Sequence, residues 1–266
     1  MHTQGSFCWR ECGTRDAVAA RAFYNGLFGW DGADQPMPGE AGVYTVMKLG
    51  AEDVAGLYQM EGPQFEGVPP HWATYVSHDD VDEAVEKARA QGAEVLGGPF
   101  DVPNVGRMAV LKDPQGAVFH LLHPTESECA QVVDSSPGSF CWSELATTDP
   151  EGAKRFYGEV VGWKAVSREM APGMTYTTFL QGERPVGGMM KLEGPEWQGV
   201  PPHWMNYVSV ADTDETVERT KRLGGHVVVP PTDIPSVGRF ATLQDPTGAT
   251  FSVIALAPQE GCLLYT

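Results

Sequence analysis

Histidine and glutamate side chains recur at matched places in this chain and are its first candidates for chemistry. The stretch VPPHW occurs twice and carries His71 and His203. The stretch GSFCW also occurs twice, and each time a glutamate follows two residues later, as Glu11 and Glu144. An imidazole and a carboxylate can exchange protons with a substrate, and both can also hold a divalent metal ion. Which chemistry applies depends on the elements that position these residues.

A third histidine, His120, interrupts the apolar run VFHLL. Burying a polar group without a partner costs on the order of a few kcal/mol, so an imidazole there needs a partner or a cavity. The matching residue later in the chain is Ser252, so the two places differ. We interpret His120 as a pocket residue. For His71 and His203 a pocket role stands against a simpler one, in which the imidazole satisfies a backbone group at the start of a strand.

These residues belong to a tandem duplication that covers almost the whole chain of 266 residues. The stretch FYNGLFGW returns as FYGEVVGW, and VGRMAVLKDPQGAVFHLL returns as VGRFATLQDPTGATFSVI. Repeats of this length indicate two equivalent domains. We place the first domain at 5–124 and the second at 138–257, with a polar linker at 125–137 and a C-terminal tail at 258–266.

Each copy contains the same series of predicted elements twice. A short strand at 6–11 precedes a helix that Asp16 caps and Gly29 ends. This helix is expected to bury an apolar stripe of Val18, Ala22, Phe23 and Leu27. Strands follow at GVYTVMKLG and EDVAGLYQM, and after VPP the order starts again with the strand HWATYVS and the helix DDVDEAVEKARAQG. The pattern is β-α-β-β-β, four times in the chain.

Strand alternation predicts which side chains share a face of the sheet. On the first strand Trp9 and Glu11 lie on one face, and Cys8 lies on the other. On the strand that begins the second unit, His71 and Tyr75 share a face. The corresponding residues of the second copy are Trp142, Glu144, His203 and Tyr207. Each copy therefore offers a carboxylate, an imidazole and two aromatic rings.

The repeated β-α-β-β-β unit resembles the vicinal oxygen chelate superfamily, which includes glyoxalase I, extradiol dioxygenases, fosfomycin-resistance enzymes and bleomycin-binding proteins. The stretches that carry the resemblance are TRDAVAARAFYNGLFGW, HWATYVSHDDVDEAVEKARAQGAEV and LKDPQGAVFHLL, each with its second copy. The tandem arrangement is similar to actinobacterial two-domain proteins called glyoxalase-like or hydroxylase. The resemblance implies an α+β fold, with four units in two tandem domains of open curved sheets and a ligand in each trough.

The resemblance also implies three metal-ligand positions in a domain, which fall here on Trp9, His71 and His120. A tryptophan cannot bind metal, so a three-ligand site would need Glu11 beside the two histidines. In the second copy the same positions hold Trp142, His203 and Ser252. The cofactor alternatives are a divalent Zn, Ni, Mn or Fe ion on His71, His120 and Glu11, or no metal. Units could also pair across the copies, which would bring Glu144 to His71 and His120.

Other candidate residues point to substrate binding. Trp9 and Trp142 supply flat walls that suit an aromatic or extended molecule, or they simply fill a trough. Arg107 and Arg239 follow the glycine of VGR. Each arginine could clamp an anionic substrate or form an ion pair with a glutamate on the neighbouring strands.

Composition excludes several kinds of partner. The formal net charge is −17, which repels nucleic acid and anionic membranes. The five cysteines are an odd number in a chain of this size, which favours free thiols in a reducing compartment. No apolar run reaches the length of a membrane span, and the N-terminus lacks a secretory pattern. We expect a cytoplasmic monomer or homodimer whose partner is a small molecule.

Two functions fit these residues. The first is a glyoxalase-like enzyme, a lyase, isomerase or oxygenase, that acts on a carbonyl-containing or natural-product-like metabolite and not as an ordinary glyoxalase I. In it Glu11 or His120 moves a proton and His71 polarises a carbonyl. The alternative is a metal-free protein of the bleomycin-resistance type that sequesters a hydrophobic metabolite or antibiotic.

Overall fold

The computed structural model describes residues 3–37, 42–125, 135–171 and 173–258. The predicted linker and C-terminal tail lie largely outside these residues. Each copy contains two β-α-β-β-β units, as predicted. The elements of the first copy are β1 (Phe7–Thr14), α1 (Ala17–Phe28), β2 (Asp31–Pro36), β3 (Val43–Leu49), β4 (Glu52–Gln59), η1 (Pro63–Phe65), β5 (His71–Ser77), α2 (Val81–Ala90), β6 (Glu94–Val102), β7 (Gly106–Lys112) and β8 (Val118–Pro124). Those of the second are β9 (Phe140–Thr147), α3 (Pro150–Val161), β10 (Lys164–Ala171), β11 (Met174–Gln181), β12 (Arg184–Lys191), η2 (Pro195–Trp197), β13 (His203–Ser209), α4 (Thr213–Arg222), β14 (His226–Ile234), β15 (Gly238–Gln244) and β16 (Thr250–Leu256).

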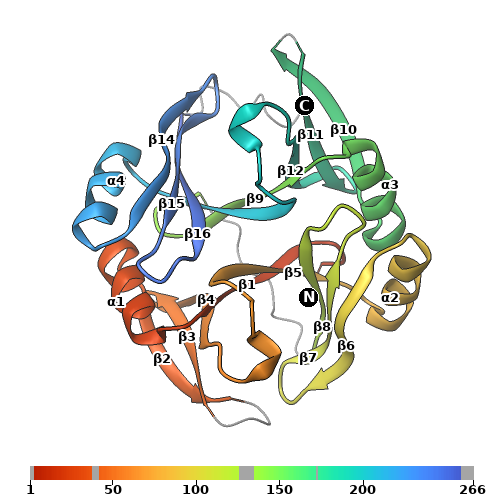
Figure 1. Ribbon diagram of the computed structural model, residues 1–266, viewed down its shortest axis with the longest axis horizontal. Helices are drawn as coiled ribbons and strands as arrows, with labels where there is room; N and C mark the ends of the chain where they lie inside the picture. Colours follow the sequence, from red (N-terminus) through yellow and green to blue (C-terminus); the bar gives the residue numbers. More distant parts are fainter. Residues whose placement is uncertain (1–2, 38–41, 126–134, 172, 259–266) are drawn as a thin grey trace.

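Each copy forms its own eight-stranded sheet (Figure 1). The strand order is β2-β3-β4-β1-β5-β8-β7-β6 in the first copy and β10-β11-β12-β9-β13-β16-β15-β14 in the second. The two units of one copy meet where β1 pairs with β5 and where β9 pairs with β13, both antiparallel. The units therefore pair within each copy and not across the copies, which decides a question that the sequence left open.

The edge strand β2 has no counterpart in the sequence pattern. Its residues, DGADQP, are polar and pair only with β3 at the end of the sheet. An edge strand exposes most of its side chains, so it lacks the apolar alternation by which strands are recognised. A bidentate ion pair between Arg21 on α1 and Asp34, with a nitrogen–oxygen distance of 3.0 Å, ties this strand to the helix.

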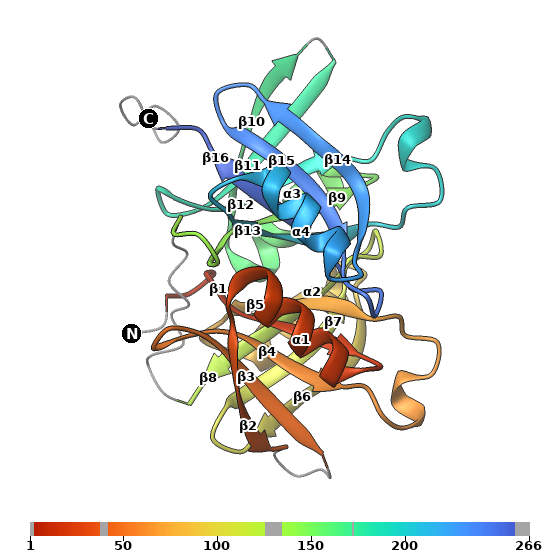
Figure 2. The same cartoon turned by 90° about the vertical axis from the view of Figure 1, so that its left-hand side faces the viewer.

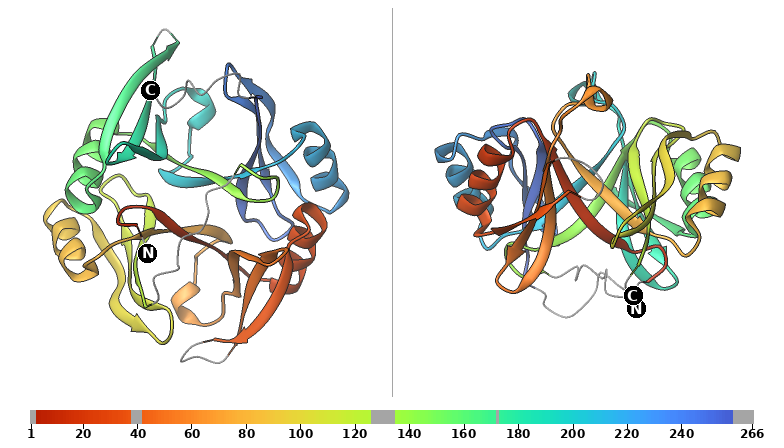
Figure 3. Two further views of the ribbon diagram at one scale, coloured as in Figure 1. Left: turned by 180° about the vertical axis from the view of Figure 1, so that it is seen from behind. Right: turned by 90° about the horizontal axis from the view of Figure 1, so that it is seen from below.

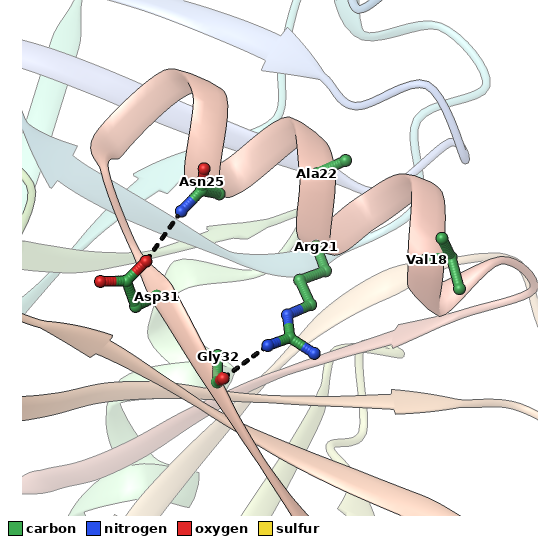
Figure 4. A pocket seen from close by; sticks show the side chains of 6 residues that line it. All are labelled: Val18, Arg21, Ala22, Asn25, Asp31 and Gly32. Carbon is green, nitrogen blue, oxygen red and sulfur yellow. Dashed lines mark hydrogen bonds between the residues drawn. The ribbon is translucent and has the colours of Figure 1, made fainter.

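Helix α1 begins and ends where the sequence predicts. The Asp16 carboxylate accepts a hydrogen bond from the Ala19 amide at 2.9 Å, and Gly29 ends the helix in the left-handed conformation, with φ 74°. The predicted apolar stripe is confirmed for Phe23 and Leu27 and wrong for Val18 and Ala22. The buried residues of the helix are Ala20, Phe23, Tyr24 and Leu27, which share the side of the helix that faces the protein interior. Val18 and Ala22 are exposed, and in Figure 4 they border a shallow surface hollow.

The hydrophobic cores are shared between the copies. Helix α1 packs beside α4, and α2 packs beside α3, so that the helices lie in two pairs at the flanks of the molecule (Figures 1 and 3). In one core Phe23 of α1 lies with Leu243 and Phe251 of the second copy. In the other core Phe156 of α3 lies with Phe119 of the first copy. Each sheet is therefore covered in part by a helix of the other copy.

A buried hydrogen-bond chain locks the two copies together. Trp72 of the repeated PPHW donates through its indole nitrogen to the Tyr24 hydroxyl at 2.8 Å. Tyr24 in turn donates to Asp245, in the DPTG turn of the other copy, at 2.9 Å. The second copy forms the same chain, from Trp204 to Tyr157 at 2.9 Å and on to Asp113 at 3.0 Å. The repeated FY, PPHW and DPxG motifs are thus explained by one hydrogen-bond chain that joins the copies.

A second pair of locks uses the tryptophan that follows each first helix. The indole of Trp30 donates to the Gly138 carbonyl at 2.8 Å, and the indole of Trp163 donates to the Gly5 carbonyl at 2.7 Å. Gly5 and Gly138 are the matching first residues of the repeated GSFCW. The duplicated GW and GSFCW stretches therefore hold each other across the interface.

Polar groups also meet their own counterparts at the junction of the central strands. The Arg10 guanidinium, which is fully buried, donates to Ser143, its equivalent in the second copy, at 2.9 Å. Thr74 and its equivalent Asn206 exchange hydrogen bonds. Burial lowers the pKa of Arg10 to about 10, which still leaves the side chain charged at neutral pH. Such contacts are expected where two equivalent copies meet about an approximate twofold axis.

Removing the Tyr24 hydroxyl is expected to destabilise the whole chain. Tyr24→Phe leaves the Trp72 indole and the Asp245 carboxylate without that partner, and an unsatisfied buried group costs about 1 to 3 kcal/mol. We expect a loss of about 2 to 4 kcal/mol in the free energy of unfolding, measured by urea denaturation. The matched variant Tyr157→Phe should cost a similar amount, and an unchanged midpoint for either would contradict the lock.

The cysteines that the structure describes are thiols. Cys8 and Cys12 are buried and Cys141 is partly exposed, and none of these three forms a disulfide. Cys129 and Cys262 lie outside the described residues. Within the described part of the chain, no helix is both long and apolar enough to cross a lipid bilayer.

Candidate functional site

The candidate site lies on the face of the first sheet that points away from the shared cores, here called the open face. Trp9, Glu11 and Gly13 of β1 stand opposite Tyr75, Ala73 and His71 of β5 in the strand register. The residues between them, such as Trp72 and Val76, belong to the cores. The predicted alternation is therefore confirmed for these strands.

Cys8 departs from the predicted alternation. A bulge between Phe7 and Trp9 shifts the register of β1 against β5. As a result Cys8 packs with Tyr75 and Leu122 of the open face, and not with the cores as the sequence suggests. A bulge places two successive side chains on one side, which simple alternation cannot anticipate.

Glu11 is the central group of the open face. Its carboxylate accepts a hydrogen bond from the Tyr75 hydroxyl at 2.6 Å. Burial raises the pKa of Glu11 to about 7, and the hydrogen bond from Tyr75 opposes that rise only in part. The residue is mostly buried but not fully enclosed, so part of its surface remains open to a ligand. Near neutral pH this carboxyl therefore exists in both protonation states, as a proton-transfer group requires.

Small residues flank Glu11 on both neighbouring strands. Gly56 of β4 is its partner on one side and Ala73 of β5 on the other. The Tyr44 hydroxyl occupies the space above Gly56, where a Cβ atom would lie only 1.9 Å from it. Trp9 holds this hydroxyl with a hydrogen bond from its indole at 2.8 Å. The carboxyl thus stands among aromatic side chains, with small residues beside it on both neighbouring strands.

His71, at the start of β5, lies on the same open face as Glu11. Its Nδ1 atom lies 2.9 Å from the Pro69 carbonyl oxygen. A carbonyl oxygen can only accept, so in the neutral ring Nδ1 carries the hydrogen and Nε2 is the acceptor. This contact is the backbone interaction that the simpler interpretation of His71 expected. It also leaves one nitrogen of the ring for a ligand.

His120 lies beside Tyr75 and stacks on its ring, with centroids 4.4 Å apart and planes 24° apart. It is 8% exposed, and burial lowers its pKa to about 3. The ring is therefore neutral at physiological pH. Its Nδ1 is buried and has no hydrogen-bond partner among the described residues. This geometry suits a residue that holds Tyr75 in place better than one that moves a proton.

The donor set of the first copy does not fit a three-ligand metal site. In the described part of the chain there is no group of three His, Cys, Asp or Glu side chains that could hold an ion. Glu11 is engaged by Tyr75, and His120 is stacked against the same ring. His71 stands opposite Gly13, one pleat further along β1 than Glu11. A facial site needs three donors directed at one point, so we derive no chemical step through a metal.

The second copy has a similar arrangement, with a second tyrosine bonded to its glutamate. Glu144 accepts hydrogen bonds from both Tyr176, at 2.7 Å, and Tyr207, at 3.0 Å. The indole of Trp142 holds Tyr176 at 2.9 Å. Met205 takes the place of Ala73 opposite the glutamate. Burial raises the pKa of Glu144. His203 contacts the Pro201 carbonyl at 2.8 Å, as His71 contacts Pro69, and Ser252 is hydrogen-bonded to Thr242.

Arg107 and Arg239 lie elsewhere. Arg107 pairs with Asp82 and Asp101, and Arg239 pairs with Asp214 and Asp233, all at the surface. Along β7, Met108 packs with the open face and Ala109 with the core, so alternation directs Arg107 away from Glu11. The ion pairs expected with Glu11 and Glu144 are therefore wrong, and the structure brings neither arginine to the open face.

Two aromatic residues of the site were missed by the sequence analysis. Tyr44 and Tyr58 reach the open face from β3 and β4, which pair beside β1. Tyr44 has its match in Tyr176, 132 residues later, so the repeat itself could have identified it. Tyr58 is replaced by Met190, a difference of the same kind as that between His120 and Ser252.

Comparison with known proteins places the chain among relatives of several functions. The family model "Glyoxalase/Bleomycin resistance protein/Dioxygenase superfamily" matches residues 11–121 and again 140–253. The sequence is 42% identical over 259 residues to CFP32, a candidate glyoxylase of Mycobacterium bovis, and this match covers 97% of the chain and 98% of CFP32. It is 36% identical over 263 residues to the anthracycline biosynthesis protein DnrV of Streptomyces peucetius, covering 95% and 94%.

Solved structures share the fold at low sequence identity. The Mn(II)-bound glyoxalase from Novosphingobium aromaticivorans superposes with a TM-score of 0.60 at 15% identity, over 96% of this chain and 83% of that one. The 2,2',3-trihydroxybiphenyl 1,2-dioxygenase of Sphingomonas wittichii gives a TM-score of 0.61 at 14% identity, over 99% and 95%. These likenesses support the predicted α+β architecture of two tandem domains.

Proposed function

The chain belongs to the glyoxalase/bleomycin resistance protein/dioxygenase superfamily, and we propose that its first copy catalyses proton transfer on a neutral, planar metabolite that carries a carbonyl group. The observation that carries this proposal is Glu11, a partly buried carboxyl whose pKa is raised to about 7 among aromatic side chains. A base whose pKa lies near the working pH is the most effective one for moving a proton.

The reaction is a proton transfer without change of oxidation state. The ionised Glu11 carboxylate removes a proton from a carbon next to the carbonyl, and the electron pair of that C–H bond forms the double bond of an enolate. The negative charge then rests on the carbonyl oxygen. Protonated Glu11 returns the proton to the same carbon or to another one, which gives exchange or isomerisation. Tyr75 positions the carboxyl through its hydrogen bond.

The walls of the site favour a flat and uncharged substrate. Trp9, Tyr44, Tyr58 and Tyr75 surround Glu11, and large aromatic rings bind flat molecules by stacking. Arg107 and Arg239 are engaged in surface ion pairs, so they offer no clamp for an anionic substrate. The likeness to a protein named for anthracycline biosynthesis supports a natural product as the substrate.

The pH dependence of exchange tests this proposal. We expect the protein to catalyse deuterium incorporation from D2O into the carbon next to the carbonyl of 1-tetralone, followed by NMR. Because only the ionised carboxylate is a base, the rate should rise with pH through about 7 and then level off. A rate that stays flat or falls across this range would contradict Glu11 as the base.

A second candidate function is sequestration without turnover. It is favoured by Glu144, which accepts a hydrogen bond on each carboxylate oxygen and faces Met205, so that the second copy suits binding better than catalysis. Quenching of tryptophan fluorescence by 1,4-dihydroxyanthraquinone, a neutral planar hydroxyquinone, measures such binding. Tight binding of this probe without any deuterium exchange into 1-tetralone would favour sequestration. The cytoplasmic location and the absence of macromolecular partners stay predictions.

A further inference from the structure

The two copies differ at three neighbouring positions around the glutamate. Gly13, Tyr58 and Ala73 of the first copy correspond to Ala146, Met190 and Met205 of the second. In the strand register Gly13 lies between Tyr58 of β4 and His71 of β5. The differences therefore lie close to Glu11 on the open face. As a result only the first copy has a tyrosine, Tyr58, beside its histidine, His71.

Gly13 allows two polar side chains to approach each other over the backbone of β1. A Cβ atom at Gly13 would lie 2.8 Å from the Tyr58 hydroxyl and 3.2 Å from Cε1 of His71. Both rings thus lean over the same point of the strand. An alanine there, as in the second copy, would force the Tyr58 ring to move, since real Cβ atoms essentially never come within 3.0 Å of another atom. The His71 ring would have to give by a few tenths of an ångström. Burial raises the pKa of Tyr58, so its hydroxyl remains a hydrogen-bond donor at neutral pH.

We propose that Tyr58 and His71, brought together over Gly13, bind a carbonyl group with a neighbouring hydroxyl group, and that this pair makes the first copy the working one. The Tyr58 hydroxyl donates to the carbonyl oxygen and stabilises the charge that develops there when Glu11 removes a proton. The Nδ1 hydrogen of His71 is donated to the Pro69 carbonyl, so Nε2 is the acceptor. Nε2 therefore accepts a hydrogen bond from the substrate hydroxyl. The inference rests on the proposed function and narrows its substrate to hydroxy-ketones.

The loop between β4 and β5 braces this pair, and only the first copy has the brace. Arg15 donates to the carbonyl oxygens of Met60 at 3.0 Å and Val68 at 3.1 Å, and also to that of Phe65. Phe65 packs on the Tyr58 ring, with centroids 5.8 Å apart. In the second copy Thr148 stands at the place of Arg15.

The loop with η1 and its counterpart with η2 project on the same side of the molecule (Figure 2). Because Pro69, the partner of His71, belongs to the braced loop, Arg15 helps to position both Tyr58 and His71. A flexible loop would lose entropy when a ligand ordered these side chains, and bracing reduces that cost.

The pair is tested with two probes that differ by one hydroxyl group, 8-hydroxy-1-tetralone and 1-tetralone. Wild-type protein should bind the hydroxylated probe about 3- to 10-fold more tightly, the effect of one or two net hydrogen bonds. His71→Leu should abolish this preference. Tyr58→Phe should lower kcat for deuterium exchange into either probe about 10- to 100-fold, with a smaller change in KM. Gly13→Ala should reproduce both defects, and Ala146→Gly in the second copy should reproduce neither.

Binding and exchange separate failure of this inference from failure of the proposed function. If the wild-type protein exchanges no deuterium, the proton-transfer function is wrong. The affinities for the two probes then still test whether Tyr58 and His71 bind a carbonyl group with a neighbouring hydroxyl group. Equal affinity for both probes in the wild-type protein would overturn the inference. So would Tyr58→Phe and Gly13→Ala variants that keep the wild-type kcat and preference. Thermal unfolding of each variant excludes a general loss of structure as the cause of a defect.

Discussion

Glu11→Gln is expected to lower the rate of deuterium exchange into 1-tetralone by about 10²- to 10⁴-fold, the usual contribution of a general base. Glutamine has nearly the same shape, and its amide oxygen can still accept the hydrogen bond that Tyr75 donates at 2.6 Å. It cannot accept a proton from carbon at neutral pH. Binding of 1,4-dihydroxyanthraquinone should change little, because the aromatic walls remain.

The matched control is Glu144→Gln in the second copy. Glu144 is occupied by Tyr176 and Tyr207, so this variant should exchange deuterium at the wild-type rate. The reverse pattern, with activity lost in Glu144→Gln and kept in Glu11→Gln, would show that the working copy was assigned wrongly.

The same Glu11→Gln variant has a characteristic effect on stability. The pKa of Glu11 is raised from 4.5, the ordinary value for a glutamate, to about 7 in the folded protein, so ionisation there disfavours the folded state. Between these values the unfolded chain is ionised while the folded chain keeps its proton, and stability falls as pH rises. The variant should therefore unfold at a higher temperature than the wild type at pH 8 and at a similar temperature at pH 4. A gain of the same size at both values would rule out the raised pKa.

The second large effect concerns the first copy expressed alone, as residues 1–124, which is expected to form a homodimer. In the full chain Trp30 donates to the Gly138 carbonyl, and Tyr24 donates to Asp245. Both acceptors have equivalents in the first copy, at Gly5 and Asp113, which make the reciprocal contacts. A second molecule can therefore supply the partners of Trp30 and Tyr24, and burial of the exposed apolar core residues drives the association. Ser143, the partner of Arg10, is the exception, because its equivalent in the first copy is Arg10 itself and two arginines would meet there.

Light scattering after size-exclusion chromatography measures the mass of this fragment. A dimer that unfolds at lower temperature as it is diluted is the expected result, because association and folding are then linked. In that dimer Trp30→Ala should weaken the association, because each molecule loses an indole that holds the other. A stable folded monomer would contradict the view that the two copies complete each other's cores.

Local features of this chain were predictable because they depend on neighbouring residues. The caps at Asp16 and Gly29 follow from side-chain chemistry within a few positions. Apolar alternation along β5 placed His71 and Tyr75 on one face, and the pairing with β1 agrees. The edge strand β2 was missed for the same reason, since it is polar on both faces and local patterns do not reveal it.

The candidate site was only half predictable. Glu11, His71 and Tyr75 were identified from repetition and alternation, and the structure brings them to one face. Tyr58 joins them only because β4 pairs with β1 in one particular register. The role of His120 changed as well, from moving a proton to holding Tyr75 in place. Its burial and its stacking on Tyr75 depend on residues that are distant in the sequence.

The repeated VPPHW shows where the division lies. The sequence by itself determined the duplication, the four β-α-β-β-β units and the strand that begins at each histidine, because repeats and periodicity are local. Only the tertiary structure decided that Trp72 belongs to the hydrogen-bond chain that joins the copies, while His71 lies on the open face beside Glu11. It also decided that units pair within a copy while the cores are shared between copies. Register and packing join residues more than a hundred positions apart, and no local pattern encodes such contacts.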